Sequence, residues 1–127
     1  MHKFITIAFL LLAPSLATAQ GLDDCSGPIY ERINVGTSGD STIVTAVTGK
    51  KIRVLSFVLG AAAAVTARME SGAGGDALTG RIALTDSLIW QIDCTHGCFE
   101  TNAGETLNLE SGGAVDIDGH LTYALCN

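Results

Sequence analysis

The chain has 127 residues, of which 47% are hydrophobic and 16% are charged, and its formal net charge is −6 at pH 7. This length suffices for one domain with its own core. The acidic balance argues against nucleic acid as a partner, because proteins that bind nucleic acid carry basic patches. Fifteen glycines, two prolines and many alternating Thr, Val and Ile residues predict an all-β fold with tight turns.

Residues 1–19 have the pattern of an export signal. A short basic start, His2-Lys3, precedes the apolar run Phe4–Ala13, and Ala17-Thr18-Ala19 supplies the small-x-small sequence that signal peptidase reads. The sequence therefore predicts a signal peptide over 1–19 and a mature domain over 20–127. A retained N-terminal anchor is the alternative, whereas cleavage leaves no stable membrane anchor.

The first strands of the mature domain are short. Apolar residues begin to alternate with polar ones at Ile29, Ile33 and Val35, which indicates a strand. The glycine-containing segment Gly36–Asp40 then turns the chain. A second strand is predicted over Ser41–Thr48, with Gly49-Lys50 closing it.

The stretch Lys51–Glu70 is predicted to lie at the centre of the fold. Both faces of an extended Lys51–Leu59 are largely apolar, which is typical of a strand in the middle of a sandwich. Small residues follow, and Val65–Glu70 alternates again, so the two strands are predicted to form a central hairpin. A helix is the alternative because of Ala61–Ala64, but no cap or 3.6-residue stripe frames that run.

The second half of the chain predicts further short strands separated by turns. The expected strands are Leu78–Thr85, Ser87–Ile92, Phe99–Thr101, Thr106–Glu110, Ala114–Ile117 and Leu121–Cys126. The last two flank Asp118-Gly119, a dipeptide that favours a two-residue hairpin. The regular spacing predicts a single jelly-roll-like β-sandwich of about eight antiparallel strands.

The four cysteines follow an export signal, so disulfides are expected. Three connectivities are possible for the set Cys25, Cys94, Cys98 and Cys126. The close spacing of Cys94 and Cys98 favours a bond between them as a clamp on a loop. The remaining pair, Cys25 and Cys126, would then join the two ends of the domain.

A zinc site is the alternative use of the cysteine loop. Its ligands would be Cys94, His96 and Cys98, with either His120 or Asp93. Zinc sites usually contain two closely spaced cysteine pairs, and the second pair is missing here. The sequence therefore favours disulfides and predicts no metal or other cofactor.

Two further segments and one set of glutamates superficially resemble catalytic or ligand motifs. Gly39-Asp40-Ser41 has the order of a serine-protease nucleophile segment, but nothing pairs a histidine with it. Asp116–Gly119 resembles part of a calcium loop that lacks its other ligands. A solvated rim is favoured over an acid pair for Glu100, Glu105 and Glu110. The sequence therefore predicts no enzyme.

An ordered set of short segments carries a resemblance to a known family. The segments are Ser38-Gly39-Asp40, Thr42-Ile43-Val44, Gly49–Ser56, Leu78-Thr79-Gly80, Phe99-Glu100-Thr101, Gly104–Leu109 and Gly119–Tyr123. Together they resemble small virion structural proteins of tailed bacteriophages, which also occur as terminal domains of phage fibres. The resemblance implies a jelly roll that assembles as a trimer on the particle surface, without catalytic residues. The C-x3-C loop and the export signal depart from this pattern.

Two functions are therefore predicted. The first is a non-enzymatic phage virion structural protein on the virion surface, either a head decoration (cement) protein or a fibre component, with capsid or fibre subunits as partners. The alternative is an exported binding module, periplasmic or extracellular, that recognises a glycan or a surface partner.

The predicted strands carry more apolar side chains than the single core of one sandwich can bury. Some of Val44, Phe57, Leu88 and Trp90 are therefore predicted to face outward and to form a homo-oligomeric contact. A homotrimer is the expected assembly, because a cyclic arrangement buries such patches and protects sheet edges.

Overall fold

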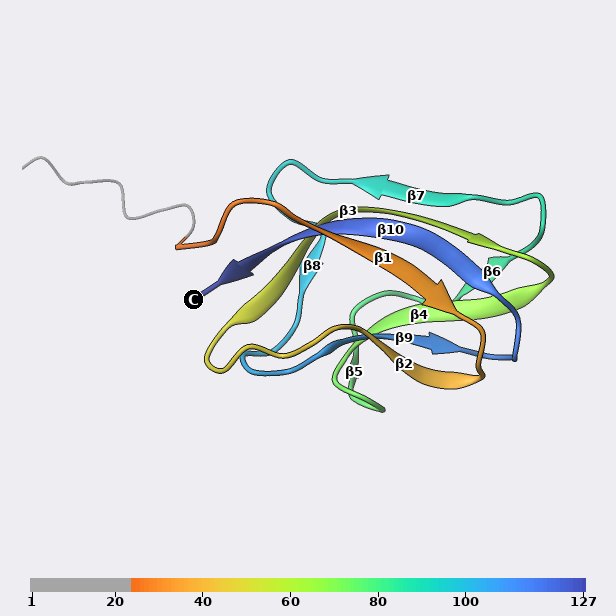
Figure 1. The fold of residues 1–127 in the computed structure, drawn as a ribbon, viewed down its shortest axis with the longest axis horizontal. Coiled ribbons are helices and arrows are strands. Elements are labelled where there is room, and N and C mark those ends of the chain that lie inside the picture. Colours follow the sequence, from red (N-terminus) through yellow and green to blue (C-terminus); the bar gives the residue numbers. More distant parts are fainter. Residues whose placement is uncertain (1–23) are drawn as a thin grey trace, which may run out of the picture.

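A computed structural model of the protein describes residues 24–127, which form a sandwich of two antiparallel β-sheets (Figure 1). The predicted all-β class and sandwich architecture are confirmed. Within this part of the chain there is no helix with the length and apolarity needed to cross a membrane. The predicted signal peptide, residues 1–19, lies outside the described residues.

Ten strands make up the two sheets. They are β1 (Ile29–Val35), β2 (Gly39–Val44), β3 (Lys51–Ala61), β4 (Val65–Ser71), β5 (Asp76–Ala77), β6 (Ile82–Leu84), β7 (Trp90–Asp93), β8 (Phe99–Glu100), β9 (Leu107–Ser111) and β10 (Ile117–Cys126). The first sheet has the order β1-β10-β3-β7, and β8 also pairs with β3. The second sheet has the order β2-β9-β4-β5, and β6 also pairs with β4. The chain crosses repeatedly between the sheets, as in a jelly roll.

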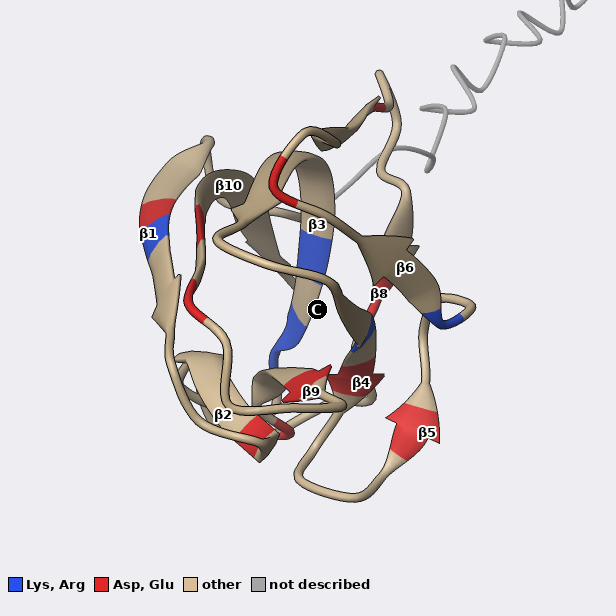
Figure 2. Cartoon of the chain, turned by 90° about the vertical axis from the view of Figure 1, so that its right-hand side faces the viewer, with Lys and Arg blue, Asp and Glu red and all other residues tan. Residues whose placement is uncertain are grey.

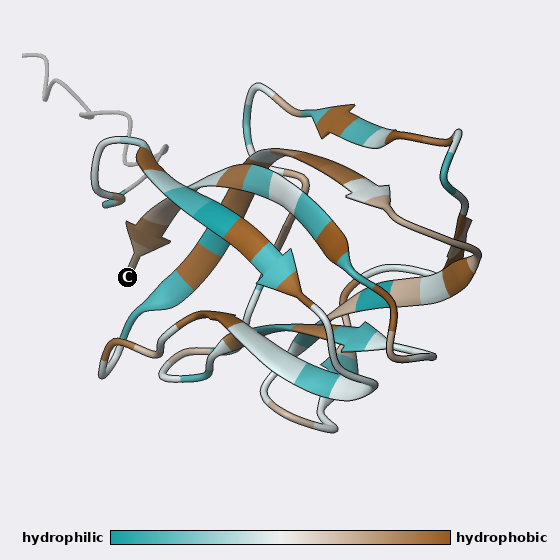
Figure 3. Cartoon of the chain, turned by 45° about the vertical axis from the view of Figure 1, so that its right-hand side comes forward, coloured by the Kyte–Doolittle hydropathy of each residue, from teal (hydrophilic) through white to brown (hydrophobic). Residues whose placement is uncertain are grey.

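The hydrophobic core lies between the sheets. Figure 3 shows apolar and polar positions alternating along β1 and β10, so that each strand turns one face to the core. The ring of Phe57 packs edge-on against Trp90, with 4.6 Å between the ring centroids, and lies 6.1 Å from Phe99. The largest fully buried apolar side chains are Phe57, Ile33, Ile52, Leu59, Met69, Leu84, Leu107, Leu109, Ile117 and Leu121.

Strand β3 changes the face that it buries partway along its length. Ile52 and Val54 are buried in the first half, and Phe57 and Leu59 are buried in the second half. The pairing with β10 shifts at this point and leaves Leu55 as an extra residue in β3, which is a β-bulge. The bulge explains why both faces of this strand are apolar in the sequence.

The predicted central hairpin is wrong, because β3 and β4 lie in different sheets. β3 has β10 on one side and β7 and β8 on the other, so no edge remains for β4. The small residues after β3 form an exposed bend that carries the chain to the other sheet. The amide of Ala62 in this bend donates to the carbonyl of Asp116 at 2.9 Å.

The predicted hairpin at Asp118-Gly119 is also wrong, because β10 runs through this dipeptide without a turn. Gly119 pairs with Ile33 on one side and with Leu59 on the other. A Cβ atom at Gly119 would lie 1.9 Å from the carbonyl oxygen of Val58. The glycine therefore permits a close approach of two backbones instead of forming a turn.

Fewer apolar side chains face outward than the sequence predicts. Val44 and Phe57 are buried in the core, and Trp90 is half-buried. The predicted outward position is found for Leu88, which lies beside β7 with two other exposed apolar residues. We call this group the β7 patch; its exposed fractions are Leu88 47%, Ile89 66% and Ile92 36%.

Candidate functional site

One disulfide joins Cys25, ahead of β1, to Cys126 at the end of β10, with 3.9 Å between their Cα atoms. Backbone bonds accompany it. The amide of Ser26 donates to the carbonyl of Leu125 at 2.7 Å, and the amide of Leu125 donates to the hydroxyl of Ser26 at 3.0 Å. These bonds and the disulfide together hold both ends of the described chain at one end of the sandwich (Figure 1).

The second disulfide joins Cys94 to Cys98 and closes the loop between β7 and β8, which we call the cysteine loop (residues 94–98). The amide of Cys94 donates to the carbonyl of Leu55 at 2.9 Å, and the amide of Cys98 donates to the carbonyl of Val54 at 2.7 Å. Both ends of the loop are thus fixed on β3 at its bulge. The bulge presents the Leu55 carbonyl to the loop instead of to the regular ladder of β10.

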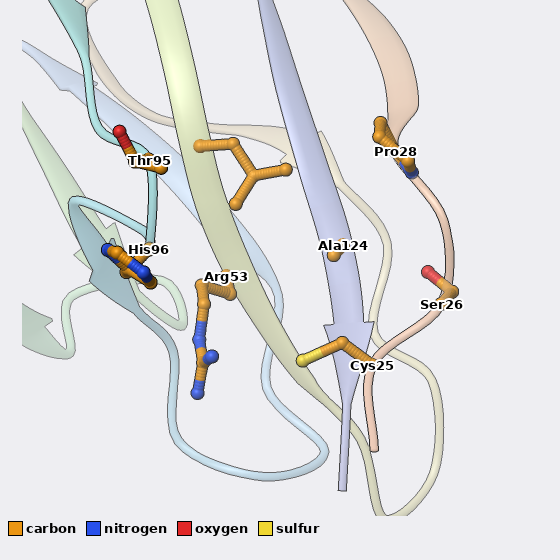
Figure 4. Close-up of a pocket in the computed structure, with 8 residues that line it drawn as sticks. Cys25, Ser26, Pro28, Arg53, Thr95, His96 and Ala124 are labelled. Atoms are coloured by element: carbon orange, nitrogen blue, oxygen red, sulfur yellow. The ribbon is translucent and has the colours of Figure 1, made fainter. Parts of the chain in front are cut away.

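A depression of about 330 Å³ lies between these two features on the outer surface of the first sheet (Figure 4). Thr95 and His96 of the cysteine loop lie on one side of it, and Cys25, Ser26 and Pro28 lie on the other. Its remaining lining residues are Arg53, Leu55 and Ala124. Ala124 lies between the two sides of the depression (Figure 4).

A carboxylate pairs with two cations near the depression. Glu100 lies 3.0 Å from the amine of Lys51 and 3.0 Å from the guanidinium of Arg53. The hydrogen bond from Lys51 lowers the pKa of Glu100 below its ordinary value, and the hydrogen bond and charge of Arg53 lower it further, against the opposing effect of burial. This arrangement holds Arg53 in place beside the loop.

Glu100→Gln is expected to destabilise the protein at pH 7 by about 0.5–1 kcal/mol, the usual size for a partly exposed ion pair. A lowered folded-state pKa gives stabilisation that is complete above the ordinary Glu value of about 4.3 and is lost as the pH falls through the folded-state pKa. The gap between variant and wild type should therefore narrow as the pH falls below the ordinary Glu value of about 4.3. Thermal unfolding at pH 7, 5 and 3 measures it. The control is Asp86→Asn, at an exposed loop position; a pH-independent gap for Glu100→Gln contradicts the prediction.

A second charged cluster lies on the outer face of the second sheet, where the acidic positions of β2, β4 and β9 gather (Figure 2). Glu70 is only 1% exposed, and it lies 2.5 Å from the guanidinium of Arg68. The guanidiniums of Arg68 and Arg81 both pair with Glu110. Burial raises the pKa of Glu70, and the neighbouring carboxyl groups of Asp40 and Glu110 raise it further, while Arg68 opposes the shift.

The zinc alternative is not assembled in the structure. Cys94 and Cys98 are bonded to each other, so neither offers a thiolate to a metal. His96 lines the depression, and His120 is exposed on β10. Among residues 24–127 no group of three or more His, Cys, Asp or Glu side chains is placed to hold a metal ion.

The other sequence candidates serve structural contacts. The Ser41 hydroxyl lies 3.4 Å from that of Thr37. Asp118, from the segment compared with a calcium loop, accepts a hydrogen bond from Asn34 at 3.0 Å. Of the three regularly spaced glutamates, Glu100 and Glu110 pair with cations as described above. The third, Glu105, accepts a hydrogen bond from Ser71 at 2.5 Å.

The fold and the two disulfides define a jelly-roll sandwich that is clasped by cysteines at one end. No protein-family model and no curated protein matches the sequence. Among solved structures the chain is similar to one described as Bacillus endospore appendages, a novel family of disulfide-linked pili. The TM-score is 0.50, the identity is 14%, and the match covers 86% of this chain and 93% of that chain. At this identity the similarity establishes the fold.

The resemblance to phage virion proteins is corrected by this match, because the solved structure belongs to a bacterial appendage and not to a phage. The predicted roles as a head decoration protein or fibre component are therefore wrong. The predicted partners, capsid or fibre subunits, and the predicted location on the virion surface are wrong for the same reason. The alternative of a glycan-binding module is not retained either.

Proposed function

We propose that the chain is a non-enzymatic structural subunit that is exported and assembles with copies of itself into a disulfide-stabilised extracellular appendage. The observation that carries the proposal is the similarity of fold to a protein described as a subunit of disulfide-linked pili. The export pattern of residues 1–19 agrees with such a location. The two disulfides of this chain agree with an oxidising environment outside the cell.

Open sheet edges support self-assembly. β1 and β7 lie at opposite edges of the first sheet, and within residues 24–127 each pairs with a strand on one side only. An exposed edge offers unpaired N–H and C=O groups to a strand of another chain. Contact between two different edges is heterologous, and it continues as a filament unless the rotation closes a ring. The proposal therefore replaces the predicted homotrimer with an open-ended assembly.

The β7 patch supplies apolar surface at one of these edges. Leu88, Ile89 and Ile92 lie just before or within β7, so a neighbouring chain that pairs with β7 would also cover them. Exposed apolar groups of this kind commonly mark a contact surface. The patch and the edge thus favour the same side of the sandwich.

Ile89→Asp is expected to shift the protein from large assemblies to monomer, because a buried, unpaired carboxylate at the contact is unfavourable. Light scattering over a range of micromolar concentrations measures the mass. The matched control is Val47→Asp, which adds the same charge at an exposed apolar residue in the loop between β2 and β3. A wild-type protein that stays monomeric at every concentration, or that stops at a trimer, contradicts the open-ended assembly.

A further inference from the structure

We infer that the Cys94–Cys98 bond is the disulfide that opens to link copies of this chain covalently, by thiol–disulfide exchange at the cysteine loop. The inference rests on the proposed function. All four cysteines of the chain are paired within it. A covalent disulfide link between copies therefore requires one of these two bonds to exchange.

The terminal disulfide is poorly placed for exchange. Cys126 is 2% exposed and lies in β10, a central strand of the first sheet. The backbone bonds between Ser26 and Leu125 keep Cys25 beside it. An attacking thiolate must reach a sulfur along the axis of the S–S bond, so Cys126 is closed to attack and only Cys25, which is half-buried, could be reached.

The loop disulfide is better placed. Cys94 and Cys98 are half-buried, and Thr95 and His96 between them are exposed. The loop directly follows β7, so it lies at the same sheet edge as the β7 patch. A second copy that covers this edge would therefore approach the loop.

Opening this bond would leave the local fold in place. The amides of Cys94 and Cys98 donate to β3 carbonyls, and these bonds do not depend on the S–S bond. Gly97 at the loop turn has φ +100°, and a Cβ atom there would lie 2.6 Å from the Arg53 side chain. The loop is thus held by backbone contacts and close packing, so both sulfur atoms remain presented after the bond opens.

The exchange is balanced in electrons. A thiolate, supplied first by a small-molecule thiol, attacks one sulfur of the loop disulfide. The electron pair of the S–S bond leaves on the other sulfur as a new thiolate. That thiolate attacks the loop disulfide of the next copy, so each step consumes one disulfide and one thiolate and forms one of each. No oxidant is needed, and each copy becomes linked to two neighbours through Cys94 and Cys98.

The test mixes ¹⁴N- and ¹⁵N-labelled full-length protein with a small amount of reduced glutathione and then blocks free thiols by alkylation. Cleavage at acidic residues, before Asp93 and after Glu100, isolates the loop from Cys126. We expect a ladder on non-reducing gels and disulfide-linked pairs of this peptide that contain both isotopes. C94S/C98S should lose the ladder while light scattering still detects assemblies.

Three other outcomes are distinguishable. Mixed-isotope peptides that contain Cys25 or Cys126 overturn the inference and place the link at the termini. Assemblies without any mixed-isotope peptide also overturn it but leave the proposed function intact. A protein that neither assembles nor forms a ladder contradicts the proposed function and the inference together.

Discussion

Gly119→Ala is expected to prevent the native pairing of β3 and β10. The added Cβ atom would lie 1.9 Å from the carbonyl oxygen of Val58 and 3.2 Å from the Cα atom of Leu59. Both are backbone atoms, so a change of rotamer cannot relieve the overlap. β10 also carries β1, and β3 also carries β7, so neither strand can shift without disrupting the whole first sheet.

The expected loss is at least about 4 kcal/mol, the range of the most damaging single substitutions and close to the whole stability of many small domains. Urea denaturation followed by circular dichroism measures it. Gly60→Ala is the matched control: Gly60 lies in β3 opposite Asp118, and a Cβ atom there meets no heavy atom within 4 Å. Equal stability of the two variants would contradict the explanation of Gly119.

The second large effect is expected from the terminal disulfide. C25S/C126S removes a bond between residues 101 apart in sequence, and the chain-entropy model assigns such a closure about 4–5 kcal/mol. C94S/C98S removes a closure between residues only four apart, for which the same model gives about 2 kcal/mol. Unfolding in urea under non-reducing conditions compares the two variants. A larger loss for C94S/C98S would show that the loop disulfide, and not the terminal one, is the main structural bond.

Local signals in the sequence predict much of this fold. Alternating apolar residues place β1 and β9 close to their observed bounds, with Leu107 and Leu109 facing the core. The small residues that follow β3 end it close to the predicted position. These features depend on residues that are neighbours along the chain, so they can be predicted from the local sequence pattern.

Strand pairing could not be predicted in the same way. Whether Gly119 marks a turn or a close approach depends on Val58, which is far away in the sequence. The bulge at Leu55 likewise exists only because β10 pairs with β3 in a shifted register. A hairpin signal indicates only that a local turn is favourable. At both predicted hairpins the strands pair with partners that are distant in the sequence, and no hairpin forms.

The candidate site was only partly predictable. Spacing indicates the cysteine pairs that the structure contains, but the depression between them depends on Arg53, Leu55 and Ala124, which only the first sheet brings together. The alternation over Val65–Glu70 does not indicate that Glu70 is buried, yet its side chain is only 1% exposed and pairs with Arg68. An Arg-x-Glu pair on one strand face is a weak signal, because most such pairs remain in solvent.

The resemblance to phage proteins has a physical explanation in the segments that carried it. Ser38-Gly39-Asp40 lies where the chain enters β2, and Gly49-Lys50 lies in the turn before β3. Such segments satisfy the needs of tight turns and strand ends, which recur in unrelated sandwiches. They therefore indicate the architecture correctly without indicating the function.

The clasp between Cys25 and Cys126 also decides how the subunit bears mechanical load. A pull applied to the chain on either side of this pair passes through one covalent bond instead of through the strands between them. The enclosed segment, about 340 Å long if fully extended, then cannot be drawn out. When the chain is pulled from its two ends, force spectroscopy should therefore detect unravelling of the sandwich only after the disulfide is reduced.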